Sequence, residues 1–323
     1  AVGALAKPIF NMDALMVSAS DNLPNVWNPD YKTRALTKDE IDEYIHAYAE
    51  VAYLCKQNGV DGVEVHAVHE GYLLDQFTTA YTNNRTDEYG GSLENRLRFA
   101  TRVVKAIKAR CGEDYPVLLR YSVTSKVIDF NVGAIPGEEF EELGRNMEES
   151  EKAVKILEAA GYDGLNTDNG TYDSWYWAHP PVYMPQNCNL KEAIHIKQFV
   201  NIPVICAGKM QPDAANKAIE EGKLDGFGIA RALLADAEYI TKLKEGRFDD
   251  IRPCIGCHNG CLPTGKYKGS KGVTMVTEKG FNSSGDCAVN PYTHHEKKYT
   301  LTPAKNPKKI AVIGGGIGGM EVA

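Results

Sequence analysis

Four of the eight cysteines are grouped near the C-terminal end of the chain, with the spacing of a metal centre. Three follow the pattern Cys-x2-Cys-x3-Cys and the fourth comes after 25 intervening residues: Cys254, Cys257, Cys261 and Cys287. Thiolates ligate the irons of a cubane iron–sulfur cluster, and Gly256 and Gly260 would let the backbone fold around so bulky a ligand. Structural zinc is the alternative, but zinc usually takes two separated Cys-x2-Cys pairs or Cys2His2 spacing. The pattern therefore favours an iron–sulfur cluster, with His258 as a surface residue rather than a ligand.

A glycine-rich turn follows an apolar run at residues 309–313. Its glycines are Gly314, Gly316 and Gly319, in the pattern G-x-G-x-x-G. Such a turn opens a helix whose N-terminus binds the pyrophosphate of a dinucleotide. We expect the first strand and turn of a Rossmann-like domain here. The acidic residue that binds the ribose would lie about 20 positions further on, so FAD and NAD both stay open.

Two histidines and a tyrosine follow another apolar run: His66, His69 and Tyr72. Imidazoles can donate hydrogen bonds to a substrate oxygen. A phenol with an ordinary pKa near about 10 suits the delivery of a proton to a carbanion-like carbon. An ordinary polar loop with one core histidine is the alternative.

Basic and small residues follow three further apolar runs: Arg120, Gly208, Lys209, Ala230 and Arg231. A fixed guanidinium would stabilise the negative charge near N1 of a reduced flavin. Glycines and a helix N-terminus late in a barrel commonly hold a phosphate. Salt bridges at the rim of the sheet are the alternative.

Residues 175–183 form an aromatic segment that includes Trp175, Trp177 and Tyr183. At the mouth of a barrel such a loop could wall an apolar, planar substrate. Packing over the edge of the core is an equal alternative.

These residues follow short apolar runs that we predict to be strands, each preceded by a helical segment. The predicted strands are 60–66, 116–122, 163–168, 203–208 and 225–230, and helices are predicted from the capping box Thr37–Glu40 to Gly59 and at 92–111, 138–160, 191–200 and 213–221. Such alternation predicts a parallel sheet. A closed barrel collects all strand ends at one mouth, whereas a doubly wound sheet concentrates function at one switch point. We favour a (β/α)8 TIM barrel. Since residues 1–36 look irregular, we expect its N-terminal strands to be missing.

The composition of the 323 residues limits the classes of protein to which the chain can belong. With 43% hydrophobic residues the chain can bury a large core, and a net charge of −7 argues against a nucleic-acid surface. We expect no membrane span, no disulfide framework and a reducing cytoplasm. The expected units are a barrel at 1–250, an iron–sulfur segment at 251–299, and at 300–323 a linker with the start of a dinucleotide-binding domain.

Together, these motifs resemble Old Yellow Enzyme-like flavin reductases that carry an iron–sulfur cluster and a C-terminal FAD domain. This group includes 2-enoate reductase, 2,4-dienoyl-CoA reductase and trimethylamine dehydrogenase. The matching stretches run in family order: 61–99, 203–209, 229–238, 252–261 and 287–291. The aromatic segment favours the 2-enoate reductase branch.

The resemblance implies that the barrel binds FMN, that the four cysteines ligate [4Fe-4S] and that the last domain binds FAD. Electrons would pass from NAD(P)H to FAD, to the cluster and to FMN, which would deliver hydride to the β-carbon of an activated alkene. Tyr72 would protonate the α-carbon, while His66 and His69 bind the activating carbonyl or carboxylate. The expected partner is a small alkene, with homo-oligomerisation left open.

Two features depart from the family pattern. His66 precedes Tyr72 by six positions, whereas the family commonly shows five. Either the two histidines keep their spacing and the tyrosine shifts, or Glu70 takes the second position in the pocket and His69 bulges. A glutamate would bind an anion poorly unless protonated, which burial could favour. The gap before Cys287 is also longer than usual, and we interpret residues 265–284 as a surface insertion.

Within the family, trimethylamine dehydrogenase-like amine oxidation is the second hypothesis, because Trp175 and Trp177 could form an aromatic cage for a cationic nitrogen. A zinc-containing barrel that acts as a binding or assembly module is a third, from another class of protein. The His-His-Tyr group favours alkene reduction.

Overall fold

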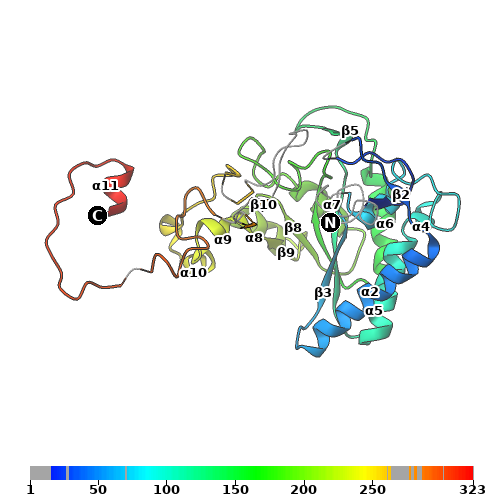
Figure 1. Cartoon of the computed structure of the whole chain (residues 1–323), viewed down its shortest axis with the longest axis horizontal. Helices are drawn as coiled ribbons and strands as arrows, with labels where there is room; N and C mark the ends of the chain where they lie inside the picture. The colour runs from blue at the N-terminus through cyan, green and yellow to red at the C-terminus, as the bar shows by residue number, and fades with distance from the viewer. Residues whose placement is uncertain are drawn as a thin grey trace.

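The computed structural model describes residues 16–26, 29–69, 71–259, 261–262, 276–277, 280–281, 286–300 and 302–322. At its centre is a parallel sheet of five strands (Figure 1), β3 (Val63–Val68), β4 (Val117–Ser122), β7 (Gly164–Asp168), β8 (Val204–Ala207) and β9 (Gly226–Gly228). The strands are neighbours in the order in which they follow one another along the chain. A doubly wound sheet reverses this order at its switch point. The uninterrupted order is that of an arc of a barrel, and each strand lies within three residues of its predicted bounds.

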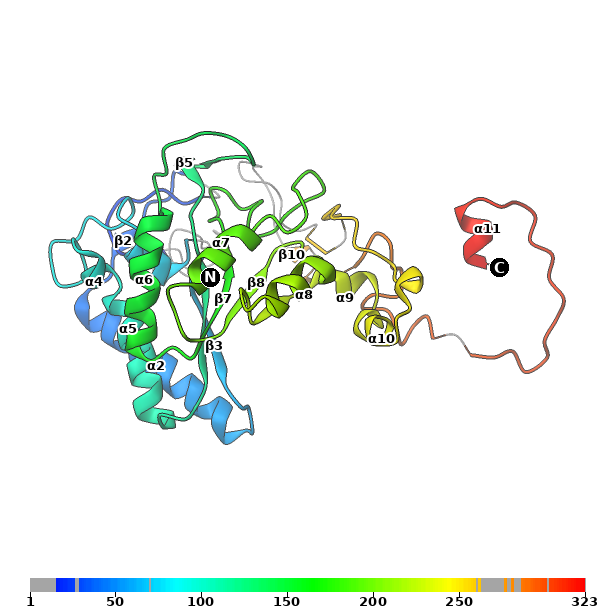
Figure 2. The same cartoon turned by 180° about the vertical axis from the view of Figure 1, so that it is seen from behind.

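Helices connect the strands and pack on one another along the outside of this arc (Figures 1 and 2). They are α2 (Lys38–Gln57), α5 (Arg98–Cys111), α6 (Met147–Ala160), α7 (Leu190–Lys197) and α8 (Pro212–Glu220). Helix α2 packs on α5, α5 on α6, and α6 on α7. Their inner faces bury apolar side chains such as Ile41, Val104 and Leu157 against the sheet. The predicted capping box is present, since the Thr37 side chain accepts from the backbone of Glu40 and Glu40 accepts from that of Thr37.

Two helix predictions need correction. The helix predicted at 138–160 begins at Met147, where the Asn146 side chain accepts a hydrogen bond from the backbone of Glu149. Before it, Glu142 accepts from the backbone of Lys126, which holds the chain in a loop instead. This loop also contains a short hairpin, β5 (Val127–Asp129) and β6 (Val132–Gly133). The helix predicted at 92–111 is divided at Leu97 into α4 (Leu93–Arg96) and α5.

A buried ion pair fixes the segment that follows Tyr72. This segment is α3 (Leu73–Thr78), and its Asp75 accepts from the guanidinium of Arg145 at 2.6 Å. Arg145 is wholly buried and also donates to the Ser122 carbonyl at the end of β4, at 2.7 Å. Burial alone would lower the pKa of Arg145, but Asp75, Tyr121 and Glu149 together outweigh it and raise the pKa above the ordinary value. The pair therefore ties α3 to the end of β4.

Near the N-terminus, residues 1–15 lie outside the described residues, but the next segment is more regular than predicted. Strands β1 (Val17–Ser18) and β2 (Arg34–Ala35) form a parallel pair. The Ser18 hydroxyl donates to the Gln76 side chain at 2.6 Å, which joins β1 to α3. This segment therefore supports the helix that follows the His-His-Tyr group.

The chain leaves the sheet through α9 (Arg231–Ala235), α10 (Tyr239–Lys244) and the 3-10 helix η1 (Phe248–Asp250). The cysteine segment follows, with a short antiparallel pair, β10 (Val276–Thr277) and β11 (Gly280–Phe281). Most of the predicted insertion at 265–284 lies outside the described residues. None of the helices in the described part is both long and apolar enough to cross a membrane.

Residues 302–322 extend away from the rest of the molecule (Figures 1 and 2). They end in α11 (Ile317–Val322), so the helix expected after the glycine-rich turn is present. The strand predicted at 309–313 is not formed, and Ile313 is 99% exposed. A strand needs a hydrogen-bonded neighbour, and in the described part of the chain this segment has none.

Candidate functional site

Three rings meet at the end of β3. The His66 and His69 ring centroids lie 4.9 Å apart, and the Tyr72 ring lies 5.1 Å from that of His66. A bulge between His66 and Val68 interrupts the pairing of β3 with β4. His66 is exposed, whereas His69 is turned inward and only 2% exposed. His69 therefore keeps its place inside the site, and Glu70 lies outside the described residues.

A buried carboxylate at the end of β7 holds His69 in place. His69 Nε2 lies 2.9 Å from Oδ2 of Asp168, whose side chain is fully buried. The other ring nitrogen, Nδ1, lies 3.0 Å from Nε2 of His66. Because a carboxylate accepts the Nε2–H, Nδ1 of a neutral His69 accepts from His66. Both nitrogens of His69 thus bond within the protein, whereas the ring of His66 is exposed.

Arg120, at the end of β4, shares the same carboxylate. Its Nη2 pairs with Asp168, and its Nη1 donates to the Asn166 side chain at 2.6 Å. Its Nε also lies 3.4 Å from Nε2 of His69. The contacts described for Arg120 therefore match the alternative interpretation, in which it forms salt bridges at the rim of the sheet rather than stabilising a reduced flavin. Asp168 thus joins side chains from the ends of β3, β4 and β7.

Gly208 and Lys209 follow β8, but the structure explains the glycine without a phosphate. Gly208 has a φ of +114°, and a Cβ there would lie 2.2 Å from Nδ2 of Asn189. Asn189 is buried, and the same nitrogen donates to the carbonyls of Trp177 and Ala207, each at 3.0 Å. The close approach of this amide therefore requires a glycine.

Two cations stand at the ends of β8 and β9. The Lys209 ammonium donates to three carbonyls of the segment after β7, those of Pro181, Val182 and Met184. Arg231, which follows the N-cap Ala230, donates to the carbonyl of Pro180 at 2.8 Å and contacts Nε2 of His258. Among the described residues neither cation has a carboxylate partner. Within the described part of the chain, these two cations therefore bond only to carbonyls and to a neutral imidazole, which fits a phosphate at these strand ends.

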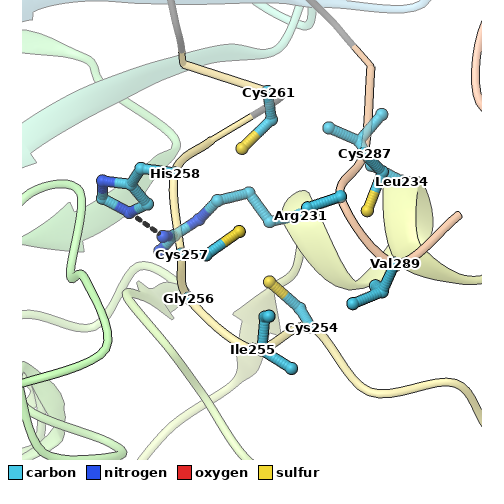
Figure 3. A pocket seen from close by; sticks show the side chains of 11 residues that line it. Arg231, Leu234, Cys254, Ile255, Gly256, Cys257, His258, Cys261, Cys287 and Val289 are labelled. Carbon is cyan, nitrogen blue, oxygen red and sulfur yellow. Dashed lines mark hydrogen bonds between the residues drawn. The ribbon is translucent and has the colours of Figure 1, made fainter.

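The four clustered cysteines surround a single cavity (Figure 3). Its other lining residues are mostly apolar: Leu234, Ile255, Ala288 and Val289 with Arg231, Gly256 and His258. All eight cysteines of the chain are free thiols. The part of the chain that the structure describes holds no group of three or more His, Cys, Asp or Glu placed to hold one metal ion. Four thiols around an apolar space are the donor set of a cubane cluster, whose body lies between its ligands.

His258 is not the surface residue that we expected. It is half-buried, and the ring of Trp175 lies 5.8 Å from its own. Burial first, and then the Arg231 guanidinium, lower the pKa of His258 to about 4. The imidazole is therefore neutral at pH 7 and can accept a hydrogen bond from Arg231.

Both tryptophans of the aromatic segment pack within the protein, as in the alternative to a wall for the substrate. Trp177 is only 7% exposed, and its Nε1 donates to the carbonyl of Ala134 at 2.7 Å. Trp175 packs against His179, with ring centroids 5.2 Å apart, and its contact with His258 turns it toward the cysteine segment. Tyr183 is 71% exposed.

The structure gives a role to Asp168, which the sequence placed among the chemistry-bearing residues at the strand ends without assigning it a function, and it adds Asn189, which the sequence did not identify. The sequence contained one indication for Asp168, which is its position at a strand end, like the positions of His66 and Arg120. Asn189 had none, because no residue near it in the sequence shows that its amide meets Gly208.

Comparison with known proteins gives a family match over residues 10–250, to the model described as the NADH:flavin oxidoreductase / NADH oxidase family. A cinnamate reductase from Clostridium sporogenes is 48% identical over 306 residues, which cover 94% of this chain and 44% of that protein. An NADH oxidase from Thermoanaerobacter brockii is 37% identical over 292 residues, covering 90% of this chain and 41% of that protein.

Among solved structures, a complex of 2-naphthoyl-CoA reductase with 2-naphthoyl-CoA matches with a TM-score of 0.75 and 34% identity. The match covers 90% of this chain and 40% of that one. The chain therefore spans less than half the length of these relatives.

We predict that Gly208→Ala destabilises the fold by about 3 kcal/mol, from the strain of a left-handed conformation and the loss of the Asn189 hydrogen bonds. Gly222→Ala is the matched control, because Gly222 has a φ of +67° and open space around its Cβ position. It should cost only about 1 kcal/mol. Urea unfolding measures both free energies, and equal losses would show that Asn189 does not constrain Gly208.

Proposed function

The chain belongs to the NADH:flavin oxidoreductase / NADH oxidase family, and on this basis we propose that it reduces an activated carbon–carbon double bond with NAD(P)H. The proposed substrate is a 2-enoate or an enone. The observation that carries the proposal is the chain of contacts from Tyr72 to His66, from His66 to His69, and from His69 to the buried Asp168. The 48% identity to a cinnamate reductase supports the 2-enoate class.

We infer that FMN is the cofactor of the barrel, which would close with eight strands in the whole protein. Lys209 and Arg231 would hold its phosphate, since each is a cation whose described partners are carbonyls or a neutral imidazole. When bound, FMN supplies the hydride. The chain's own residues then have to place the alkene, hold its acidic group and provide a proton.

The cysteine cavity supports a [4Fe-4S] cluster held by Cys254, Cys257, Cys261 and Cys287. In the proposal, the turn formed by Gly314, Gly316 and Gly319 would hold FAD, and FAD and the cluster would supply the electron transfer between NAD(P)H and FMN. The apolar lining would keep water from the cluster, which is one of the factors that set its potential.

As an imidazolium whose Nε2–H bonds to His69, the exposed His66 would donate its Nδ1–H to the carboxylate or carbonyl of the substrate and withdraw charge from the double bond. His69 would orient it, because Asp168 fixes the His69 ring and the two imidazoles share a hydrogen bond. Tyr72 would donate its hydroxyl proton to the α-carbon as hydride arrives at the β-carbon. The tyrosinate would then regain a proton from solvent.

Two alternatives within the family differ in support. Reduction of an enoyl thioester, as in 2,4-dienoyl-CoA reductase, is favoured by the structural match to a CoA-thioester complex. Trimethylamine dehydrogenase-like amine oxidation is less favoured, because Trp177 is buried and Trp175 packs against His179 and His258. These two side chains therefore do not form the cage that the hypothesis needs. Family membership likewise favours an enzyme over a zinc-containing assembly module.

We predict that Tyr72→Phe slows the oxidation of the reduced flavin by cinnamate by about 10²-fold or more, because the general acid is lost. Reduction of the flavin by NADH should stay normal, since it needs no proton from Tyr72. Anaerobic stopped-flow absorbance measures both half-reactions. Tyr44→Phe, in helix α2, is the control for loss of a hydroxyl elsewhere. Unchanged oxidation by cinnamate would show that Tyr72 is not the acid.

We predict about four iron atoms per chain and visible absorbance from two flavins in the full-length protein purified without oxygen. Cys254→Ala should lower the iron content sharply, because one ligand of the cluster is removed. Cys188→Ala should leave it unchanged, since Cys188 lies outside the cavity and burial raises its pKa to about 12. Stoichiometric zinc in a colourless protein would overturn the assignment.

A further inference from the structure

Tyr172, in the segment after β7, contacts Tyr72, the proposed acid. Its ring centroid lies 6.0 Å from that of Tyr72, at an interplanar angle of 82°. His66 lies against Tyr72 at 5.1 Å and 71°. Both are edge-to-face contacts, the arrangement that aromatic rings prefer. Tyr72 is thus flanked by rings that come from two different strand ends.

The backbone on both sides of Tyr172 is tied to the loop after β4. Before it, the Gly170 amide donates to the carbonyl of Thr124 at 2.8 Å. After it, Asp173 accepts from the backbone amide of Asn131 at 2.7 Å and from the Tyr81 hydroxyl at 3.4 Å. These bonds fix the residues next to Tyr172 on both sides before any ligand arrives, and such preorganisation is what a selective pocket requires.

Ser174 adds a further tie to the same loop. Its hydroxyl accepts from the Thr171 amide at 2.9 Å and donates to the carbonyl of Ser125 at 2.6 Å. Ser174 is fully buried, so these bonds are shielded from water. Tyr172 therefore stands on a short turn with fixed ends.

The two tryptophans in the segment after β7 make contacts elsewhere. Trp177 is buried against the loop after β4, and Trp175 faces His179 and His258. Within the described residues, Tyr172 is the ring of the segment that contacts Tyr72.

We propose that Tyr172 determines substrate specificity, as an aromatic wall beside Tyr72 against which the planar substituent on the β-carbon of the alkene packs. The inference rests on the proposed function and deepens it. Stacking on such a ring and burial beside it favour an aryl substituent over a methyl group by about tenfold. The protein is therefore selective for aryl-substituted enoates.

The test compares Tyr172→Leu with Tyr172→Phe in the full-length, flavin-loaded protein, using cinnamate and crotonate as substrates. Leucine removes the ring, so kcat/KM for cinnamate should fall about tenfold while that for crotonate changes less than about twofold. Phenylalanine keeps the ring and should preserve the ratio. An equal loss for both substrates, or an unchanged ratio in the leucine variant, overturns the inference.

Binding of the saturated products separates this inference from the proposed function. Isothermal calorimetry with 3-phenylpropanoate and butanoate needs no turnover, and the leucine variant should lose about tenfold in affinity for 3-phenylpropanoate alone. If the wild type reduces neither enoate but the leucine variant selectively loses affinity for 3-phenylpropanoate, the proposed reaction is wrong and the aromatic wall is supported. If the leucine substitution leaves the ratio of the two affinities unchanged, the wall fails, whatever the reaction. Flavin content and thermal unfolding confirm that each variant is folded.

Discussion

The buried carboxylate of Asp168 is the group around which the site is arranged. A carboxylate without solvent must be paired or hydrogen-bonded, because an isolated buried charge is very costly. Here two groups meet this demand, the His69 imidazole from β3 and the Arg120 guanidinium from β4. The ends of three adjacent parallel strands are thereby held to one point, and the orientation of the His69 ring follows from it. His66 and Tyr72 take their positions from His69 and from α3, which the Arg145–Asp75 pair ties to β4.

The segment after β7 extends this arrangement to the cysteine cavity. At one end Tyr172 contacts Tyr72, and further on Trp175 contacts His258, which directly follows Cys257. Arg231 bonds to the carbonyl of Pro180 in the same segment and lines the cavity. One loop thus touches both the proposed acid and the proposed cluster. This gives the two halves of the proposed reaction a common structural support.

The features that the sequence predicted well are those set by local pattern. The capping box, the apolar runs and the glycines that end helices predicted the order of the elements, and the chemistry-bearing residues at the ends of all five predicted strands favoured a barrel over a doubly wound sheet. The sequence also indicated a group formed by His66, His69 and Tyr72, because these residues stand within seven positions at the end of a predicted strand. The cysteine spacing likewise predicted that four thiols share one space.

What could not be predicted depends on contacts between residues far apart in the chain. Nothing near Gly208 shows that the Asn189 amide occupies the space of its missing side chain. The helical pattern at 138–146 was overruled by the bonds of Glu142 to the backbone of Lys126. The run at 309–313 has the composition of a strand, but strand formation also depends on hydrogen-bonded neighbours. The role of Trp177 was decided by burial, which its aromatic character alone did not reveal.

The most direct test of the central claim is Asp168→Asn, followed by single-turnover oxidation of the reduced protein by cinnamate. The neutral amide keeps the shape but no longer balances Arg120 or fixes the tautomer of His69. The account predicts that oxidation by cinnamate slows by about 10²-fold, with flavin reduction by NADH unchanged. Oxidation at the rate of the wild type, over the same range of pH, would contradict it.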